Sequence, residues 1–327
     1  MNIRILSLAE IEGLGISITE VMDVVERGFR LKGEEKVELP AKIGIHPRHD
    51  CFIHAMPCFV GADADVAGVK WVSGYPINQS KGLPYITGVM CLNDPETGFV
   101  KTFMDAGWIT AWRTGAATGV CARHMGDPES RTLAVIGLGV QGRTNTVALA
   151  NALPRLKTVK ACDVHSSQLE KYRELIEKDL PGLDVVPCET VREAVKGADV
   201  VVTCTPIVAE PERFVRSDWL QDDCLAIAVD YDSAFEADVM TGAEAFVCDD
   251  RNQYLWTQRQ GVYFQKGYPG EKDILEDMGD LCTGKVTAPK KGRRGAVLMG
   301  IASHDVLTAD LIYRKSSEKR VGKVVDI

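Results

Sequence analysis

Long apolar runs are missing from this sequence, and no stretch approaches the roughly 18 residues that a membrane-spanning helix requires. The first residues also lack the apolar core of a signal peptide, because Glu10 and Glu12 interrupt it. Basic residues are in the minority, with 38 Lys and Arg against 46 Asp and Glu and a net charge of -8. Since duplex binding needs a basic surface, we expect a cytoplasmic protein that binds neither nucleic acid nor membrane.

Cysteine pairs with metal-site spacing are absent as well. The ten cysteines include no C-x-x-C pair, and no Cys/His cluster is typical of a zinc site. Several lie inside apolar runs, for example Cys204 and Cys248, where free cysteine behaves as a small buried hydrophobe. We therefore expect free thiols, no disulfide framework and no metal.

The length of 327 residues corresponds to about two domains. From residue 132 onward, apolar runs alternate with stretches that begin like helices, among them Ser167-x-x-Glu170 and Thr190-x-x-Glu193. This alternation predicts an α/β fold with a doubly wound parallel sheet. The expected strands cover 132–136, 158–163, 184–188, 200–204 and 225–229, with 245–247 as one more.

The first 125 residues follow a different pattern. Two capping boxes begin at Ser7 and Ser17, and the second leads into an amphipathic helix that ends at Gly33. Short apolar runs then predict strands, the last two of which flank a hairpin turn at 93–98. These strands cover 51–56, 66–73, 85–92 and 99–104, and a helix is expected over about 106–124. Near the C-terminus, the basic run at 290–294 is expected to form an exposed loop.

A glycine-rich loop follows the expected strand 132–136 and opens a helix. Its sequence is Gly137-Leu138-Gly139-Val140-Gln141-Gly142. The first glycine permits a tight turn, the second lets the backbone approach a pyrophosphate, and the third lets the helix pack on the sheet. Because a helix N-terminus also offers free N–H groups to phosphates, we expect this loop, with Val140 and Gln141, to bind a dinucleotide.

Asp163 lies 21 residues after Gly142, at the end of the next expected strand. A carboxylate there can accept hydrogen bonds from both ribose hydroxyls of NAD and would repel a 2′-phosphate. No Arg follows within residues 164–167 to receive that phosphate, although His165 could soften the preference. We therefore expect NAD, with NADP as the less favoured cofactor.

Asp230 follows the expected strand 225–229, and ligands of an open parallel sheet bind outside the carboxyl ends of its strands. An acid at this position is well placed to face a nicotinamide. The alternative is an N-cap for a helix after residue 233. Thr203 and Thr205 are expected to line the cofactor rather than to react.

Further stretches complete a recognisable pattern. Residues 68–78, 92–98 and 113–119, followed by the glycine loop and Ala228-Val229-Asp230, resemble the ornithine cyclodeaminase/mu-crystallin family over nearly the whole chain. The resemblance implies a Rossmann domain that binds NAD over 125–304. It also implies an α+β substrate-binding and dimerisation domain, made of 1–124 and 305–327, and a homodimer.

The resemblance also implies roles for individual residues. Lys70 matches a family lysine near the substrate carboxylate and the reacting carbon, and Arg113 matches the arginine that clamps that carboxylate. A planar guanidinium suits this clamp because it can hold a carboxylate through two hydrogen bonds. Asp230 matches the family's acid/base aspartate. Thr87, Thr114 and Met299 match positions beside the cofactor.

Departures from the family pattern bear on the substrate. Lys42 stands where cyclodeaminases carry an arginine, so the charge is kept and the planar fork is lost. His54 stands where a true ornithine cyclodeaminase carries a glutamate suited to a distal ammonium. A histidine does not attract an ornithine side chain and could receive a carboxylate or hydroxyl, although a structural role on a strand is an equal alternative. The stretch 231–236 replaces a family Pro-Gly-Lys segment, so that lysine contact is not transferred.

The sequence therefore favours an NAD-dependent reductase of a small 2-imino acid, or equivalently an amino-acid dehydrogenase. Arg113 and Lys42 would orient the carboxylate, Lys70 would polarise the substrate, and Asp230 would exchange a proton. The cationic residues together with His54 suggest an imino dicarboxylate such as iminosuccinate. Two alternatives remain: a cyclodeaminase that retains NAD, and a nucleotide-loaded, crystallin-like binding protein.

Overall fold

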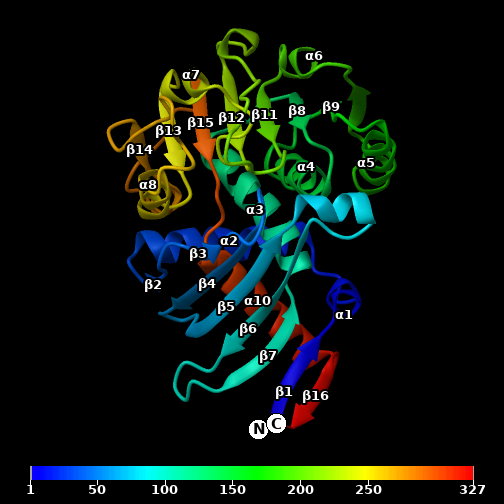
Figure 1. Cartoon of the computed structure of the whole chain (residues 1–327), viewed down its shortest axis with the longest axis vertical. Coiled ribbons are helices and arrows are strands. Elements are labelled where there is room, and N and C mark those ends of the chain that lie inside the picture. Colours follow the sequence, from blue (N-terminus) through cyan, green and yellow to red (C-terminus); the bar gives the residue numbers. More distant parts are fainter. Residues whose placement is uncertain (1, 327) are drawn as a thin grey trace. The chain divides into compact units, whose positions relative to one another are not determined.

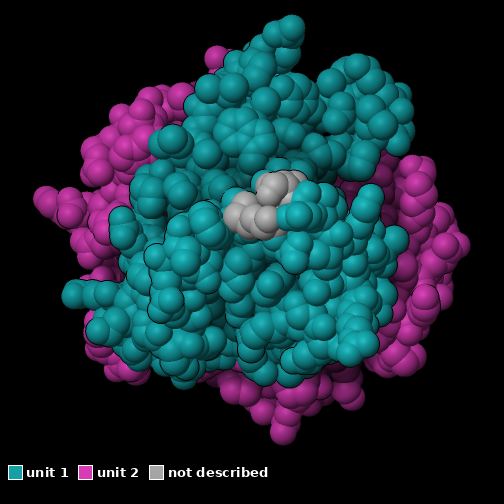
Figure 2. Space-filling model, turned by 90° about the horizontal axis from the view of Figure 1, so that it is seen from below, with its two compact units in different colours: residues 1–113, 300–327 teal, residues 114–299 magenta. Residues whose placement is uncertain are grey.

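The computed structural model describes residues 2–326 and contains two eight-stranded sheets (Figure 1). The chain divides into two compact units (Figure 2). Unit 1 runs up to Arg113 and resumes at Gly300, and unit 2 spans Thr114–Met299. The first division falls inside helix α3 (Gly107–Met125), earlier than the domain boundary expected from the sequence. The sequence pattern treats this helix as one element and therefore gives no reason to divide it.

The sheet of unit 2 is parallel throughout and confirms the doubly wound fold. Its order is β10-β9-β8-β11-β12-β15-β13-β14, and the central strands β11, β12 and β13 are buried along their whole length. The order reverses between β8 and β11, which is the point where such sheets bind ligands. The bounds are β8 (Thr132–Ile136), β9 (Thr158–Cys162), β10 (Asp184–Pro187), β11 (Val200–Thr203), β12 (Cys224–Ala228), β13 (Ala245–Cys248), β14 (Ile274–Asp277) and β15 (Arg293–Val297).

The helices of unit 2 match the expected alternation with one shift. Helix α5 begins two residues early, with His165 rather than Ser167 at its N-cap. Thr190 does cap α6, since its hydroxyl accepts from the Glu193 N–H, while the Glu193 carboxylate accepts from the Glu189 N–H. The bounds are α4 (Val140–Ala152), α5 (Ser166–Asp179), α6 (Val191–Val195), η2 (Ser217–Trp219), α7 (Ala237–Thr241), α8 (Arg251–Arg259) and α9 (Met278–Thr283).

The basic run at 290–294 is not simply an exposed loop. Arg293 and Arg294 begin strand β15, and Arg294 is only 2 % exposed. Its guanidinium donates to the carbonyl of Met125 and to the carboxylate of Asp223. Because these acceptors replace water, the charge can be buried, and composition alone cannot reveal such partners.

The sheet of unit 1 is mixed, in the order β16-β1-β7-β6-β5-β4-β2, with β3 also paired to β4. Only the β1–β7 pair is parallel among its described pairs. The bounds are β1 (Asn2–Leu6), β2 (Val37–Glu38), β3 (Ile43–Ile45), β4 (Phe52–Val60), β5 (Val66–Gly74), β6 (Ile86–Asn93), β7 (Val100–Asp105) and β16 (Lys323–Asp326). The returning C-terminal segment thus supplies an edge strand beside β1.

Helices cover one face of this sheet. Helix α10 (Ala302–Glu318) packs against β4, β5, β6 and against α2 (Ile18–Gly33), as Figure 1 shows. Both predicted capping boxes are present: Ser17 caps α2, and Ser7 caps the short helix α1 (Leu8–Glu12). A 3-10 helix, η1 (Pro76–Lys81), links β5 to β6. Side chains that point away from α10 leave large apolar groups exposed on the other face.

The expectation of buried free thiols is confirmed, since all ten cysteines are free and most are buried. Across residues 2–326, no helix has the length and apolarity needed to cross a membrane.

Candidate functional site

The glycine loop of unit 2 is built so that side chains cannot replace two of its glycines. Gly137 has a φ of 92°, and a Cβ there would lie 2.6 Å from the carbonyl oxygen of Cys204. A Cβ on Gly142 would lie 2.2 Å from the carbonyl oxygen of Gly137. The loop therefore turns tightly against the ends of β8 and β11, as the sequence predicts.

The middle glycine meets an open space instead. No atom lies within 4 Å of the Cβ position of Gly139. Gly139 is the N-cap of α4 and has no side chain to satisfy the first N–H groups of that helix. Val140, the first helical residue, is 58 % exposed. An uncapped helix N-terminus behind an open glycine fits the pyrophosphate of a dinucleotide.

Asp163 lies directly beside this loop. One oxygen of its carboxylate accepts from the Leu138 N–H at 2.7 Å, and the other accepts from the His165 N–H at 2.8 Å. These bonds fix the carboxylate at the end of β9, next to the glycine turn. Each oxygen keeps further lone pairs for ribose hydroxyls.

Asp230 follows β12 and is 1 % exposed. Its Oδ1 accepts from the Thr203 hydroxyl at 2.6 Å, and its Oδ2 accepts from the Thr205 N–H and hydroxyl at 3.0 and 2.5 Å. Because β11 and β12 are neighbouring parallel strands, their carboxyl ends bring these three residues together. The N-cap alternative is wrong, since Glu236 occupies the N-cap of the next helix, α7.

Burial raises the pKa of Asp230, and the hydrogen bonds from Thr203 and Thr205 only partly oppose this shift. A carboxylate whose pKa rises toward neutrality is better suited to exchange protons than an ordinary aspartate. The two threonines, expected to line the cofactor, therefore also orient the acid and moderate its pKa.

Unit 1 contains a buried group of three charges. Lys70 of β5 and Arg113 of α3 are 1 % and 6 % exposed, and Asp305 of α10 is fully buried. The Asp305 Oδ1 accepts from Lys70 Nζ at 2.7 Å and from Arg113 Nε at 2.9 Å. Neither cation is a surface residue, and the group carries one net positive charge when Lys70 is protonated.

The pKa values in this group follow from burial and from the neighbouring charges. Burial and the repulsion from Arg113 lower the pKa of Lys70 to about 8, while Asp305 opposes the shift. For Asp305, burial alone would raise the pKa, but Lys70 and Arg113 outweigh it and hold the pKa below its usual value. Near neutral pH the group thus combines two cations with one carboxylate.

Gly300 explains why Arg113 can reach this position. Gly300 has a φ of 83°, and a Cβ there would lie 2.2 Å from an Arg113 guanidinium nitrogen. Any larger residue would push the guanidinium away from Asp305. The absence of a side chain at Gly300, before α10, therefore allows Arg113 to reach Asp305.

His54, on β4, has positive neighbours within unit 1. Its ring stacks on Phe52 with centroids 4.3 Å apart and meets His46 edge-on at 6.2 Å. Burial, together with the smaller effects of Lys42, His46 and Lys70, lowers the pKa of His54 to about 3. His54 is therefore neutral at physiological pH and offers a hydrogen bond rather than a charge, while Lys42 supplies the charge.

The remaining predicted residues lie in different surroundings. Thr87 is exposed on β6, and its hydroxyl is 2.9 Å from that of Ser73. Thr114 and Met299 are buried in unit 2, at 6 % and 5 % exposure. Their roles beside a cofactor stay predictions.

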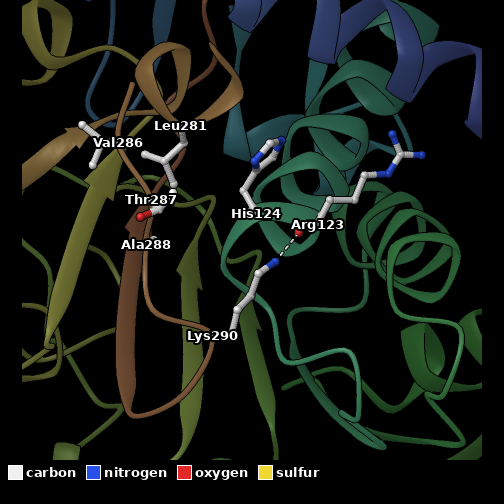
Figure 3. A pocket seen from close by; sticks show the side chains of 7 residues that line it. All are labelled: Arg123, His124, Leu281, Val286, Thr287, Ala288 and Lys290. Atoms are coloured by element: carbon white, nitrogen blue, oxygen red, sulfur yellow. Dashed lines mark hydrogen bonds between the residues drawn. The ribbon is translucent and has the colours of Figure 1, made fainter. Parts of the chain in front are cut away.

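A pocket of about 180 Å³ in unit 2 is made of other residues. It is lined by Arg123, His124, Leu281, Val286, Thr287, Ala288 and Lys290 (Figure 3). The Arg123 guanidinium points away from Leu281 and Val286, and Lys290 Nζ turns to the Arg123 carbonyl oxygen. These charges do not converge on a ligand, so the pocket adds nothing to the predicted site.

Sequence reasoning missed the role of Asp305. It lies 235 residues from Lys70 and 192 from Arg113, and no local pattern links them. The available signal was an acidic residue in the first turn of a predicted helix start.

The chain is also similar to known proteins over nearly its whole length. The chain matches the model of the ornithine cyclodeaminase/mu-crystallin family over residues 2–320. It is 31% identical over 325 residues to the nodulation efficiency protein NfeD of Rhizobium meliloti, covering 99% of this chain and 98% of that protein.

Two solved structures have the same fold. The Δ1-pyrroline-2-carboxylate reductase of Thermococcus litoralis, in complex with NADH and L-proline, has a TM-score of 0.87 at 28% identity, covering 98% of this chain and 99% of that one. An archaeal alanine dehydrogenase dimer with bound NAD has a TM-score of 0.84 at 29% identity, covering 100% of both chains.

Proposed function

Because this chain belongs to the ornithine cyclodeaminase/mu-crystallin family, we propose that it is an NAD-dependent reductase of a small 2-imino acid. The reverse reaction is that of an amino-acid dehydrogenase. The observation that carries the proposal is the buried pair of cations, Lys70 and Arg113, which share one oxygen of Asp305. Buried cations of this kind suit the carboxylate that every 2-imino acid carries.

The cofactor is NAD. Support comes from the open glycine loop, from the uncapped N-terminus of α4 and from the two related structures, which contain NADH and NAD. Asp163 would hold the ribose hydroxyls beside that loop. When bound, NAD supplies the hydride acceptor and donor of the reaction.

Residues of the chain itself would bind the substrate and transfer the protons. Arg113, with Lys42, would bind the substrate carboxylate, and Lys70 would polarise the substrate and hold a proton near it. Asp230 would take up or release the proton on nitrogen, which its raised pKa favours. Thr203 and Thr205 would keep the Asp230 carboxylate in one orientation.

The substrate that the residues favour is an imino dicarboxylate. His54 replaces the glutamate suited to a distal ammonium, its ring meets His46 edge-on, and Lys42 is close enough to lower its pKa. A second carboxylate would gain the charge of Lys42 and a hydrogen bond from the neutral His54. We therefore expect an acidic side chain on the substrate rather than a basic one.

A spectrophotometric screen tests this function. The protein is mixed with NADH, ammonium or methylamine, and one of pyruvate, oxaloacetate, glyoxylate or a cyclic imine. We expect NADH consumption with at least one acid and the fastest loss with oxaloacetate. Arg113→Met should abolish it, whereas Arg155→Met, a change at an exposed position, should not.

The other outcomes are equally informative. Ammonia release from a diamino acid without net change in NADH would identify a cyclodeaminase and contradict the proposal. No turnover with any acid would favour a nucleotide-loaded binding protein. Equal rates with NADPH would contradict the preference assigned to Asp163.

A further inference from the structure

Asp305 is not among the residues that the reaction above requires, yet it contacts two that are. It lies in the first turn of α10, has no exposed surface, and accepts hydrogen bonds from Lys70 and Arg113 on the same oxygen. Within residues 2–326, its other oxygen, Oδ2, has no hydrogen-bond partner. A structural ion pair would be expected to use both oxygens, because an unsatisfied buried acceptor costs stability.

The Arg113 contact leaves a particular part of that side chain available. Asp305 accepts a hydrogen bond from Nε, the inner nitrogen of the Arg113 guanidinium, at 2.9 Å. The two terminal nitrogens lie over Gly300, where the missing Cβ makes room for them. Asp305 therefore anchors the guanidinium by its inner nitrogen and leaves the two terminal nitrogens for a second carboxylate.

We propose that Asp305 is the positioning residue of this site: it fixes the direction of Arg113 and keeps Lys70 protonated at the pH where the enzyme works. This inference rests on the proposed function for the role of the two cations. It assigns to Asp305 no contact with substrate or cofactor.

The surrounding charges explain why one carboxylate suffices. Lys70 shares its surroundings with Arg113 of α3, with His54 and Cys58 of β4, and with His304 of α10. Both histidines are neutral near pH 7, because burial and nearby cations lower the pKa of each to about 3. Cys58 is also neutral, because burial raises its thiol pKa to about 12. Asp305 is thus the one anion among these groups, opposing the repulsion between Lys70 and Arg113.

Replacing this anion makes the proposal testable. Asp305→Asn keeps the size of the side chain and one oxygen for the two donors but removes the charge. The Lys70 ammonium then faces Arg113 without compensation, and its pKa should fall by about one unit or more. Asp305→Glu keeps the charge and should leave the pKa of Lys70 near its original value while lowering turnover through misplacement. Asp310→Asn, on the same helix in a pair with Arg314, is the matched control.

The first measurement needs neither substrate nor NAD. Lysine Cε is labelled with carbon-13, the Lys70 resonance is assigned with Lys70→Met, and its titration is followed by NMR in the whole chain. We expect a lower pKa of Lys70 in Asp305→Asn and no change in Asp310→Asn. An unchanged titration in Asp305→Asn overturns the proposal, whatever reaction the protein catalyses. If Asp305→Asn does not fold, Asp305→Ser takes its place in the same titration.

The second measurement uses turnover. In Asp305→Asn, turnover at pH 8 should fall at least about fivefold and recover as the pH is lowered, because the basic limb moves with Lys70. KM should change less than kcat, since the terminal nitrogens of Arg113 remain. An equal loss at every pH would indicate a structural role only. If the NMR shift is present but no substrate is turned over, the proposed function fails and the assignment of Asp305 stands.

Discussion

Two buried aspartates in this chain have opposite pKa shifts for a clear physical reason. Asp230 is held by hydroxyls and one N–H, which do not outweigh the cost of burying its charge, so its pKa rises. Asp305 is held by an ammonium and a guanidinium, so its pKa falls. A raised pKa suits a group that exchanges protons, and a lowered pKa suits a permanent anion. The surroundings thus separate two residues of one type into two roles.

The role of Asp230 leads to a prediction at the residue scale. Asp230→Asn keeps the hydrogen-bond geometry approximately and removes the exchangeable proton, so turnover should fall by about a hundredfold or more. NAD binding, measured by fluorescence titration, should stay within a few-fold of the original. Asp232→Asn is a poor control because Asp232 is buried with Arg213, whereas Asp222→Asn changes an exposed carboxylate. Unchanged turnover in Asp230→Asn on every accepted substrate would remove Asp230 from the mechanism.

At the scale of elements, two glycines of the loop before α4 have different functions: one shapes the fold and the other leaves space for the cofactor. Gly142 packs against the backbone of Gly137, so it shapes the turn, whereas Gly139 faces open space. Gly139 has a φ of −68°, which alanine also adopts. The two glycines therefore contribute to stability and to the cofactor site in different ways.

A matched pair of substitutions tests this separation. Gly142→Ala should lower the free energy of unfolding by about 1–3 kcal/mol, because its methyl group overlaps a carbonyl oxygen. Gly139→Ala should leave stability nearly unchanged and weaken NAD binding about tenfold or more, because the methyl group fills the space for the pyrophosphate. Urea unfolding and calorimetric titration with NAD measure the two effects. Tight NAD binding by Gly139→Ala would place the phosphates elsewhere.

Helix α10 contains a second element-scale feature, the buried His304. Its ring meets Phe29 of α2 edge-on at 4.2 Å, and neither ring nitrogen has a partner within residues 2–326. Burial lowers the pKa of His304 from 6.5 to about 3, with Arg113 adding to the shift. Between these values the unfolded chain binds a proton that the folded chain does not, so stability falls as the pH drops below about 6.5.

The contribution of His304 to acid sensitivity can be measured. At pH 5 the linkage amounts to about 2 kcal/mol, whereas at pH 7.5 it is close to zero. In His304→Leu, the loss of stability between pH 7.5 and 5 should therefore be about 2 kcal/mol smaller than in the original chain. Urea unfolding at the two pH values measures it, and His165→Leu, at an exposed position, is the control. An unchanged pH dependence in His304→Leu would mean that His304 takes up its proton in the folded state.

At the scale of the whole molecule, the exposed face of the sheet in unit 1 needs an explanation. Ile5, Trp71, Val89 and Phe103 are each 40 % or more exposed, on neighbouring strands β1, β5, β6 and β7. Ile5 lies opposite Phe103 and Trp71 lies opposite Val89 in the sheet register. A continuous apolar patch of this kind is typical of a protein interface. We propose that this outer face is buried in a homodimer.

Sedimentation tests the homodimer. The original chain should sediment at twice its 35.7 kDa mass, and Trp71→Asp should sediment as a monomer because it places a charge in the apolar face. Val164→Asp introduces the same charge at an exposed position of unit 2 and should leave the dimer intact. A dimer that persists in Trp71→Asp would place the interface on another surface.

The sequence by itself determined the features that depend on neighbouring residues. The alternation of strands and helices, the capping boxes, the glycine loop and the position of Asp163 follow from short-range patterns, because each is set by the local backbone. The fold class and the loop geometry were therefore predictable. Even Asp230 with its threonines follows from local position, since the ends of adjacent parallel strands meet at one edge of the sheet.

Only the tertiary structure decided which distant charges meet. The group of Lys70, Arg113 and Asp305 joins β5, α3 and α10, and the partners of the buried Arg294 also come from distant segments. Pairing across such distances depends on how elements pack, and single-residue patterns contain no information on that packing. The pKa shifts of Asp230 and Asp305 were undetermined for the same reason, because burial and contacts fix them rather than residue type.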